Sequence, residues 1–162
     1  MKLSGGVEWA LHCCVVLTTA QSPVPVTHLA ELHDVSGSYL AKQLQALSRA
    51  GIVQSVQGHA GGYRLTRPAA QITVLDVVEA IDGPGSTFQC TEIRQRGPLA
   101  TPPEQCTKLC AVHRAMLRAD HAWRAALRAT TIADLVADVE RDSGPQALPR
   151  VGGWLAGQLG QA

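Results

Sequence analysis

Apolar residues recur every three or four positions through the first fifty residues, a spacing that predicts consecutive amphipathic helices. The first helix is expected from Ser4 to about Thr19, the second from Val26 to Asp34, and the third from Ser36 to Ala50. Gly51 follows the third helix, where glycine commonly ends a helix in the left-handed conformation. Two helices joined by a short turn, the second with a polar outer face, indicate a helix-turn-helix motif.

Beyond Gly51 the pattern changes from helical spacing to alternation. Residues 52–57 and 63–67 alternate and contain β-branched side chains, and the glycine-rich segment 58–62 separates them. A hairpin that directly follows a helix-turn-helix is a wing. Thr73 and Asp76 then open a fourth helix as a capping box. We therefore predict a mainly α fold in which residues 1–83 form a winged helix-turn-helix DNA-binding domain with a two-stranded β wing.

The second half of the chain is expected to contain a loop, a long helix and a tail. Residues 84–110 are polar and broken by prolines, so they are interpreted as a loop that carries the candidate metal ligands. Residues 111–142 are expected to hold a long dimerisation helix and a short helix after it. The apolar stripe of the long helix consists of Val112, Met116, Ala119, Trp123 and Leu127. Residues 143–162, rich in Gly, are predicted to form a flexible tail with at most one docked turn.

Charged residues are unevenly distributed, although the net charge of the 162-residue chain is only +1. Between Val35 and Leu75 the sequence has four Lys or Arg residues and no Asp or Glu. This basic stretch coincides with the predicted DNA-binding topology, where it would follow the DNA backbone. The candidate DNA contacts are residue types that reach base edges and phosphates: Ser38, Tyr39, Lys42, Gln43, Arg49, His59, Arg64 and Arg67.

Cysteine content and hydropathy indicate the cellular setting. The five cysteines are an odd number, and the N-terminal sequence lacks the features of a secretory signal. We therefore expect reduced thiols and a cytoplasmic protein. No apolar run reaches the roughly 18 residues that a membrane span needs, so no membrane partner is expected.

Three of the five cysteines lie in one stretch, and this stretch carries the candidate chemistry. Cys90, Cys106 and Cys110 are followed by His113. The CxxxC spacing with a nearby histidine resembles a metal site. The alternative is a set of buried or redox-silent thiols.

The first helix contains a second group of possible ligands. Glu8 and His12 are four residues apart, so they lie on one face of the helix, one turn from each other. That face is not the apolar one, and a solvated pair is the plain alternative to a ligand pair. Cys13 and Cys14 are adjacent and point about 100° apart on a helix, so they are interpreted as packing residues.

The chain from Lys2 to about Glu140 resembles the Rrf2 family of bacterial winged-helix iron–sulfur regulators. The resemblance lies in the segment SGSYLAKQLQALSRAGIVQSVQGHAGGYRLTRPAAQITVLDVVEAIDG. The opening MKLSGGVEWALHCC and the loop CTEIRQRGPLATPPEQCTKLC are similar to the redox regulators within that family. Gln57 departs from the family pattern, because many members carry an arginine at this position of the wing.

The resemblance implies a homodimer that binds double-stranded DNA at an inverted-repeat operator and holds a [2Fe–2S] cluster between its subunits. In the redox regulators, it implies Cys90 and Cys110 of one chain and Glu8 and His12 of the other as ligands. In other members it implies a histidine ligand at the position of His113, which makes Cys90, Cys106, Cys110 and His113 a competing set within one chain. Trp9 lies between Glu8 and His12, so we expect it to pass a change at the cluster to the DNA-binding helices.

Three function classes are considered. The first is a redox-responsive transcriptional regulator with a [2Fe–2S] cluster. The second keeps the winged helix but makes the site structural zinc, with four ligands from one chain: Cys90, Cys106, Cys110 and His113. The third, a thiol redox enzyme, is disfavoured because CxxxC lacks both the CxxC spacing and the βαβ context of that class. We therefore expect no enzymatic activity and no small-molecule substrate.

Overall fold

The computed structural model describes residues 3–58, 61–86 and 88–160, and the chain forms two compact units. Residues 85–126 form one unit, which is called the arm below. Residues 2–84, together with residues 127–162, form the other, which is called the winged unit. Residues 127–142, predicted to belong with the dimerisation helix, thus pack with the DNA-binding motif instead.

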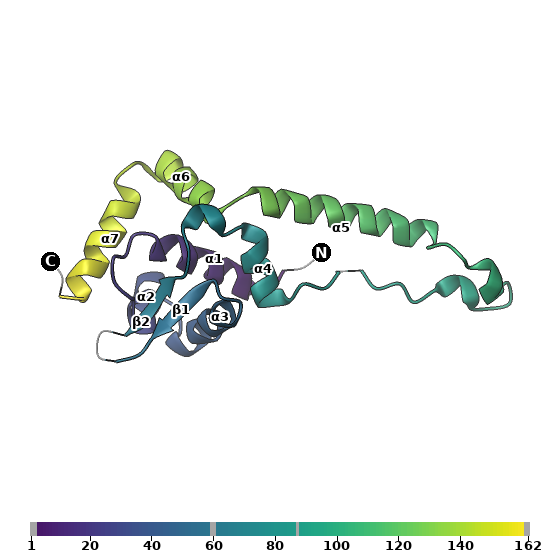
Figure 1. The fold of residues 1–162 in the computed structure, drawn as a ribbon, viewed down its shortest axis with the longest axis horizontal. Helices are drawn as coiled ribbons and strands as arrows, with labels where there is room; N and C mark the ends of the chain where they lie inside the picture. The colour runs from purple at the N-terminus through teal and green to yellow at the C-terminus, as the bar shows by residue number, and fades with distance from the viewer. Residues whose placement is uncertain (1–2, 59–60, 87, 161–162) are drawn as a thin grey trace. The chain divides into compact units, whose positions relative to one another are not determined.

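The winged unit contains the predicted helix-turn-helix and wing (Figure 1). Its first three helices are α1 (Gly5–Leu17), α2 (Val26–His33) and α3 (Gly37–Arg49). An antiparallel hairpin of β1 (Val53–Val56) and β2 (Gly62–Leu65) follows, and then the 3₁₀ helix η1 (Ala69–Gln71) and α4 (Val74–Asp82). The prediction of a mainly α, winged helix-turn-helix fold is confirmed.

Helix α1 lies at the centre of the core. Its side chains Ala10, Cys13 and Cys14 are fully buried, and they belong to the same cluster as Leu40 and Leu44 of α3. Because most of α1 is covered, both adjacent cysteines face apolar neighbours. Their interpretation as packing residues agrees with this burial. Glu8 and His12 remain exposed on the outer face of the helix.

Helix α6 (Ile132–Ser143) continues the winged unit. It begins at a capping box in which the Thr131 hydroxyl accepts from the Asp134 amide, and the Asp134 carboxylate accepts from the Thr131 amide. The Ile132 amide donates to the carbonyl of Ile72 at 2.8 Å, which ties the start of α6 to the segment before α4. The short helix predicted to follow the long helix is therefore present.

Helix α7 (Ala147–Gln158) occupies most of the predicted flexible tail, so that prediction is wrong. Leu148 and Leu155 are buried, seven residues apart on one face of the helix. Pro149 lies in the first turn, where a helix tolerates proline. A Cβ atom at Gly152 would lie 3.2 Å from the Thr19 carbonyl oxygen, so the absence of a side chain permits close packing on the end of α1.

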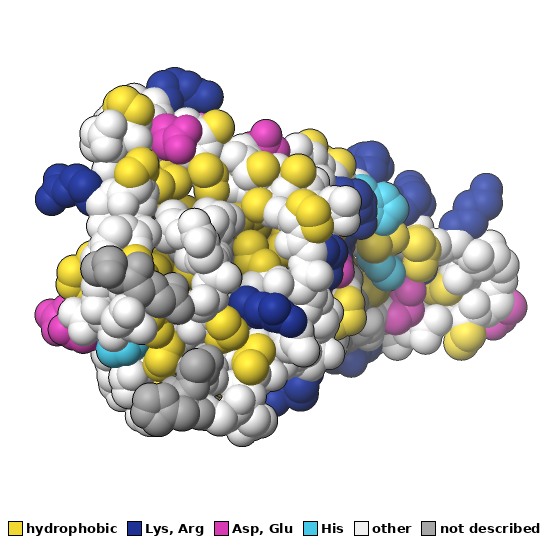
Figure 2. Space-filling view, turned by 60° about the vertical axis from the view of Figure 1, so that its left-hand side comes forward, with side chains coloured by type: hydrophobic (Ala, Val, Ile, Leu, Met, Phe, Trp, Pro, Cys, Tyr) yellow, Lys and Arg dark blue, Asp and Glu magenta, His cyan; other side chains and the backbone are white. Residues whose placement is uncertain are grey.

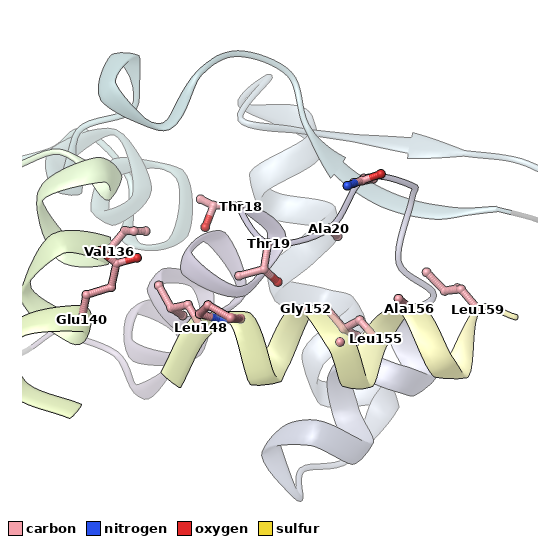
Figure 3. A pocket seen from close by; sticks show the side chains of 13 residues that line it. Thr18, Thr19, Ala20, Val136, Glu140, Leu148, Gly152, Leu155, Ala156 and Leu159 are labelled. Carbon is pink, nitrogen blue, oxygen red and sulfur yellow. The ribbon is translucent and has the colours of Figure 1, made fainter. Parts of the chain in front are cut away.

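A hollow of about 570 Å³ lies between the end of α1, α6 and α7 (Figure 3). None of the candidate site residues lines it. The hydroxyls of Thr18 and Thr19 do line it, but they donate to carbonyls of the same helix. The hollow is therefore interpreted as a gap in the packing of α7.

The arm has almost no core of its own. It contains the 3₁₀ helices η2 (Ile93–Gln95) and η3 (Pro103–Gln105) and most of α5 (Ala111–Ala129). Among the described residues of the arm, only Asp120 is buried. The exposed large apolar side chains are Ile93, Leu99, Leu109, Val112 and Met116. None of the helices that the structure describes is both long and apolar enough to cross a membrane.

The wing is joined to the chain before α2 at a position where only glycine fits. Tyr63 and Val24 exchange backbone hydrogen bonds of 2.8 and 2.9 Å. A Cβ atom on the neighbouring Gly62 would lie 2.3 Å from the Val24 carbonyl carbon. This backbone cannot move away without breaking the bridge.

Gly62→Ala should therefore destabilise the winged unit. The overpacking should lower the free energy of unfolding by roughly 2–3 kcal/mol. Gly153→Ala is the matched control, because a Cβ at that helical position meets nothing within 4 Å. Denaturant unfolding of both variants measures the difference. Equal stability of the two would show that the bridge is dispensable.

Candidate DNA-binding and metal-ligand surfaces

Helix α3 exposes a polar stripe on the side away from the core. Its members lie three or four residues apart, so they share one face. The exposed residues of the stripe are Ser38, Lys42, Gln45 and Arg49, with Tyr39 beside them. Four of the candidate DNA contacts are thus available on the second helix of the motif. Gln45, which the sequence pattern also places on this outer face, is exposed beside them.

Gln43 does not belong to this stripe, and its place among the DNA contacts is corrected. Its side chain is buried, and Gln43 lies with Leu44 on the face of α3 that packs in the core. A Cβ atom on Gly6 would lie 2.5 Å from the Gln43 side-chain oxygen, so the amide group packs directly on α1. A polar side chain at this position therefore joins two helices and does not reach DNA.

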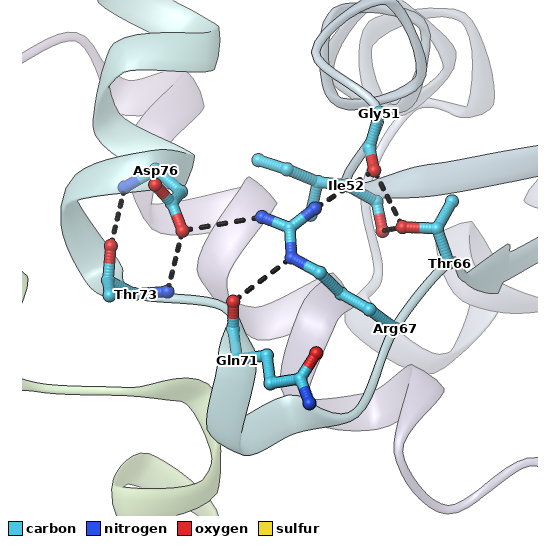
Figure 4. Close-up of polar contacts among 7 residues, drawn as sticks. All are labelled: Gly51, Ile52, Thr66, Arg67, Gln71, Thr73 and Asp76. Carbon is cyan, nitrogen blue, oxygen red and sulfur yellow. Dashed lines mark hydrogen bonds and ion pairs between the residues drawn. The ribbon is translucent and has the colours of Figure 1, made fainter.

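Arg67, one of the predicted DNA contacts, also has a structural role (Figure 4). Its guanidinium donates to the carbonyl oxygens of Gln71 and Gly51, at 3.0 and 3.1 Å, and to the Asp76 carboxylate at 3.4 Å. These three partners lie at the end of η1, after α3 and in α4. Arg67 therefore fixes the base of the wing relative to both helices.

The wing keeps one candidate cation at its surface. Arg64 is exposed, and its Nε and Nη2 both donate to the Gln54 side-chain oxygen across the hairpin. This contact orients the guanidinium of Arg64 and does not involve its Nη1 group. His59, another candidate, lies outside the described residues. Figure 2 shows Lys and Arg side chains, in dark blue, at the surface.

The Glu8–His12 pair lines a shallow groove between α1 and α6, with a volume of about 340 Å³. Leu11 and Val15 contribute its apolar wall, and Asp138 lies on the α6 side. Both members of the pair are exposed. The groove therefore presents the imidazole of His12 and the carboxylate of Glu8 from α1, with Asp138 and Asp142 of α6 beside them.

His33, at the end of α2, connects this pair with the helix-turn-helix. The rings of Trp9 and His12 each lie 5.9 Å from the His33 ring, in edge-on geometry. The His33 Nε2 atom is buried and has no hydrogen-bond partner among the described residues. Burial, and secondarily the charge of His12, lower the pKa of His33. A neutral ring thus fills the space between α1 and α2.

Cys90 and Cys110 line a single hollow of the arm, although 20 positions separate them. The hollow has a volume of about 560 Å³ and is mainly apolar. Cys110 immediately precedes α5, and its sulfur accepts a hydrogen bond of 3.2 Å from the His113 amide. The Cys110 sulfur therefore lies at the first turn of α5, where the backbone N–H groups point out of the helix.

Cys106 and His113 do not share the hollow with the other two cysteines. The His113 ring instead faces Phe88, with 5.8 Å between the ring centroids. Within the described parts of the chain, no three His, Cys, Asp or Glu side chains converge as metal ligands. The zinc site proposed from Cys90, Cys106, Cys110 and His113 is therefore not supported.

The two cysteines of α1 differ chemically from those of the arm. Burial raises the pKa of Cys13 to about 12, and that of Cys14 is raised further. Both therefore remain protonated at neutral pH, and protonated thiols are poor nucleophiles and poor metal ligands. The three cysteines of the arm are only partly buried.

Two residues of these surfaces could not be found from sequence patterns. His33 is separated by 21 residues from His12, and Arg94, which lines the hollow of Cys90 and Cys110, is one of several arginines in a loop. In contrast, the position of Cys110 at the start of α5 follows from the predicted start of that helix at residue 111.

Comparison with known proteins identifies the family. The model of the Rrf2 family, described as an iron-dependent transcriptional regulator, matches residues 3–138. The chain belongs to the Rrf2 family. This Rrf2 protein is 36% identical over 139 residues to protein aau3 of Rhizobium meliloti, which covers 84% of this chain and 85% of that protein.

Two relatives named as HTH-type regulators match only in part. The YwgB protein of Bacillus subtilis, a putative regulator by name, is 36% identical over 55% of this chain. IscR of Vibrio atlanticus is 37% identical over 56% of it. The matched segments span 58% and 53% of these two relatives.

Solved structures with the same fold include two regulators. CymR of B. subtilis, described as the global cysteine regulator, has a TM-score of 0.67 and 24% identity, over 85% of this chain and 97% of CymR. IscR of T. potens has a TM-score of 0.61 and 22% identity, over 87% of this chain and 90% of that one. At these identities the likeness establishes the Rrf2 winged-helix fold alone.

Proposed function

We propose that this Rrf2 protein is a DNA-binding transcriptional regulator whose operator affinity depends on the redox state of a [2Fe–2S] cluster held between two subunits. The observation that carries the proposal is the division of the ligand candidates into two pairs. Cys90 and Cys110 line one hollow in the arm, and Glu8 and His12 line one groove in the winged unit.

The DNA-binding part of the proposal is supported by the exposed stripe of α3 and by the wing. Helices of this kind enter the major groove and contact base edges with their outer side chains. Lys42 and Arg49 on α3, and Arg64 on the wing, are the proposed phosphate or base contacts. A two-fold dimer presents two such helices, so the operator should be an inverted repeat with half-sites about 34–36 Å apart or more.

The homodimer is supported by the composition of the arm surface. Five large apolar side chains are exposed there, and only Asp120 is buried among the described residues of the arm. Exposed apolar groups on this scale are typical of interaction sites. A second copy of the chain would cover them and would bring a second set of ligand candidates.

The donor set fits a [2Fe–2S] cluster, because each of the two irons needs two protein ligands. Two thiolates would hold one iron, and one imidazole with one carboxylate would hold the other. When bound, such a cluster accepts or releases one electron, and histidine in place of cysteine raises its reduction potential. The apolar lining of the arm hollow would limit water at the thiolates.

Visible absorption of anaerobically purified protein tests the proposal. An iron–sulfur protein is reddish-brown, whereas zinc proteins and free thiols are colourless. Removal of iron with a chelator should bleach the solution. A colourless protein that contains neither iron nor sulfide after anaerobic purification would contradict the proposed function.

The proposed coupling runs through Trp9 and His33. Because Trp9 and His12 both contact His33, a movement of His12 would displace α2, which directly precedes α3. Trp9→Ala should keep the cluster but reduce the ratio of operator affinities between the two redox states. Titrations of operator DNA with oxidised and reduced protein measure this ratio. An unchanged ratio would remove Trp9 from the mechanism.

A further inference from the structure

Arg94 connects the two ends of the cysteine loop. Its Nε atom donates to one oxygen of the Glu92 carboxylate, and its Nη2 atom donates to the other oxygen at 2.9 Å. Nη2 also donates to the Lys108 carbonyl at 3.0 Å. Glu92 lies two residues after Cys90, and Lys108 lies two residues before Cys110. The guanidinium therefore bridges the segments that carry the two cysteines.

No apolar core holds the described residues of this loop. None of the described residues from 88 to 110 is buried, so apolar packing does not fix their positions. Glu92 adopts a left-handed conformation with φ of 48°, which is unfavourable for a residue with a side chain. Its paired carboxylate offsets this cost. The Arg94 carbonyl accepts a further hydrogen bond, at 2.7 Å, from the Thr101 amide.

Arg94 also places positive charge at the hollow that Cys90 and Cys110 line. Hydrogen bonding to Glu92 raises the pKa of Arg94, and the charges of Cys106 and Cys110 act in the same direction. The guanidinium thus stays charged, and it attracts the negative sulfurs that a metal ligand requires. Lysine at this position would keep the charge but could not form the same planar pair of hydrogen bonds.

We propose that Arg94 is a positioning residue that holds Cys90 and Cys110 at one site and raises the reduction potential of the group bound there. The second half of this statement rests on the proposed [2Fe–2S] function. The first half concerns the metal-free chain alone. The two halves are therefore tested by separate measurements on the full-length protein.

The variants are Arg94→Gln, Arg94→Lys and the matched control Arg96→Gln, which removes the same charge from an exposed arginine of the same loop. In metal-free, reduced protein, Arg94→Gln should exchange the backbone amides of residues 92–110 at least several-fold faster than wild type. Arg96→Gln should leave them unchanged. Thermal unfolding of the winged unit reports whether each variant is otherwise folded.

In the cluster-bound protein, Arg94→Gln should shift the redox equilibrium about tenfold toward the oxidised form, which is a fall of about 59 mV for one electron. Arg94→Lys should restore the reduction potential more completely than it restores the protection of the backbone amides from exchange. The proposal requires both effects of Arg94→Gln, and it is overturned if either measurement matches that of Arg96→Gln. If wild-type protein holds no cluster, the proposed function fails, and the exchange measurement still decides whether Arg94 holds the loop.

Discussion

Replacing Cys90 or Cys110 with alanine should leave the anaerobically purified protein without the visible absorption of a cluster. Each change removes one of the two thiolates proposed for the same iron, and the other residues of the hollow offer no replacement ligand of that kind. His12→Ala should lose or alter the cluster, and Glu8→Ala should perturb its spectrum. Iron and sulfide content, measured with the spectrum, quantify the loss.

Cys106→Ala and His113→Ala are the matched controls, because they change a cysteine and a histidine of the same arm that lie outside the hollow. Both should keep a cluster with a nearly normal spectrum. If these two changes abolish metal binding while Glu8→Ala and His12→Ala are silent, the ligands lie within one chain and the proposed set is wrong.

Mixed dimers test the division of ligands between subunits. One chain would carry Cys90→Ala and Cys110→Ala, and the other would carry Glu8→Ala and His12→Ala. Neither chain should form a cluster alone. A dimer of the two should hold one cluster, because one of its two sites combines the intact pair of each chain. Absence of a cluster in the purified mixed dimer would contradict sharing of ligands.

Removal of two cations from the DNA-binding face is the second change with a large expected effect. Lys42→Ala combined with Arg64→Ala should weaken operator binding on the order of 100-fold near 0.1 M salt, because about four phosphates per dimer are no longer neutralised. The slope of log K against log salt should become flatter by about 0.9 for each of these phosphates. Gel-shift titrations at several salt concentrations measure both quantities.

The matched control for this experiment is Arg128→Ala combined with Arg141→Ala. These residues lie in the last turns of α5 and α6, outside the helix-turn-helix and wing, and the control changes the net charge by the same amount. Its operator affinity should stay close to wild type. An equal loss of affinity in both double variants would show that total charge, and not the proposed face, governs binding.

Local chemistry explains why so much of the fold could be predicted from the sequence. The caps at Thr73 and Thr131 act on residues three positions away, so their signals are complete within a short segment. The alternation in the wing likewise reports contacts between neighbouring strands. α7 was harder to predict, because its glycines weaken the helical signal while they permit its close contact with Thr19.

The contacts that Gln43 and Arg67 make could not be predicted, for a different reason. Gln43 and Arg67 have the polar character of DNA contacts, and their spacing does not exclude that role. Their actual partners are distant in sequence: Gly6 for Gln43, and Gly51 with Asp76 for Arg67. Whether a polar side chain faces solvent or joins two elements is decided by such contacts, which no local pattern contains.

The backbone bridge between Val24 and Tyr63 has a consequence for how a signal could change operator affinity. The hairpin is attached to the chain before α2 by this bridge and to α3 and α4 by Arg67. These contacts join the wing to α3, the second helix of the motif, so we expect the two to keep their relative position. Redox control of such a protein would then change the angle or the distance between the two DNA-binding units of a dimer. The length of the DNA segment that each unit contacts would stay constant.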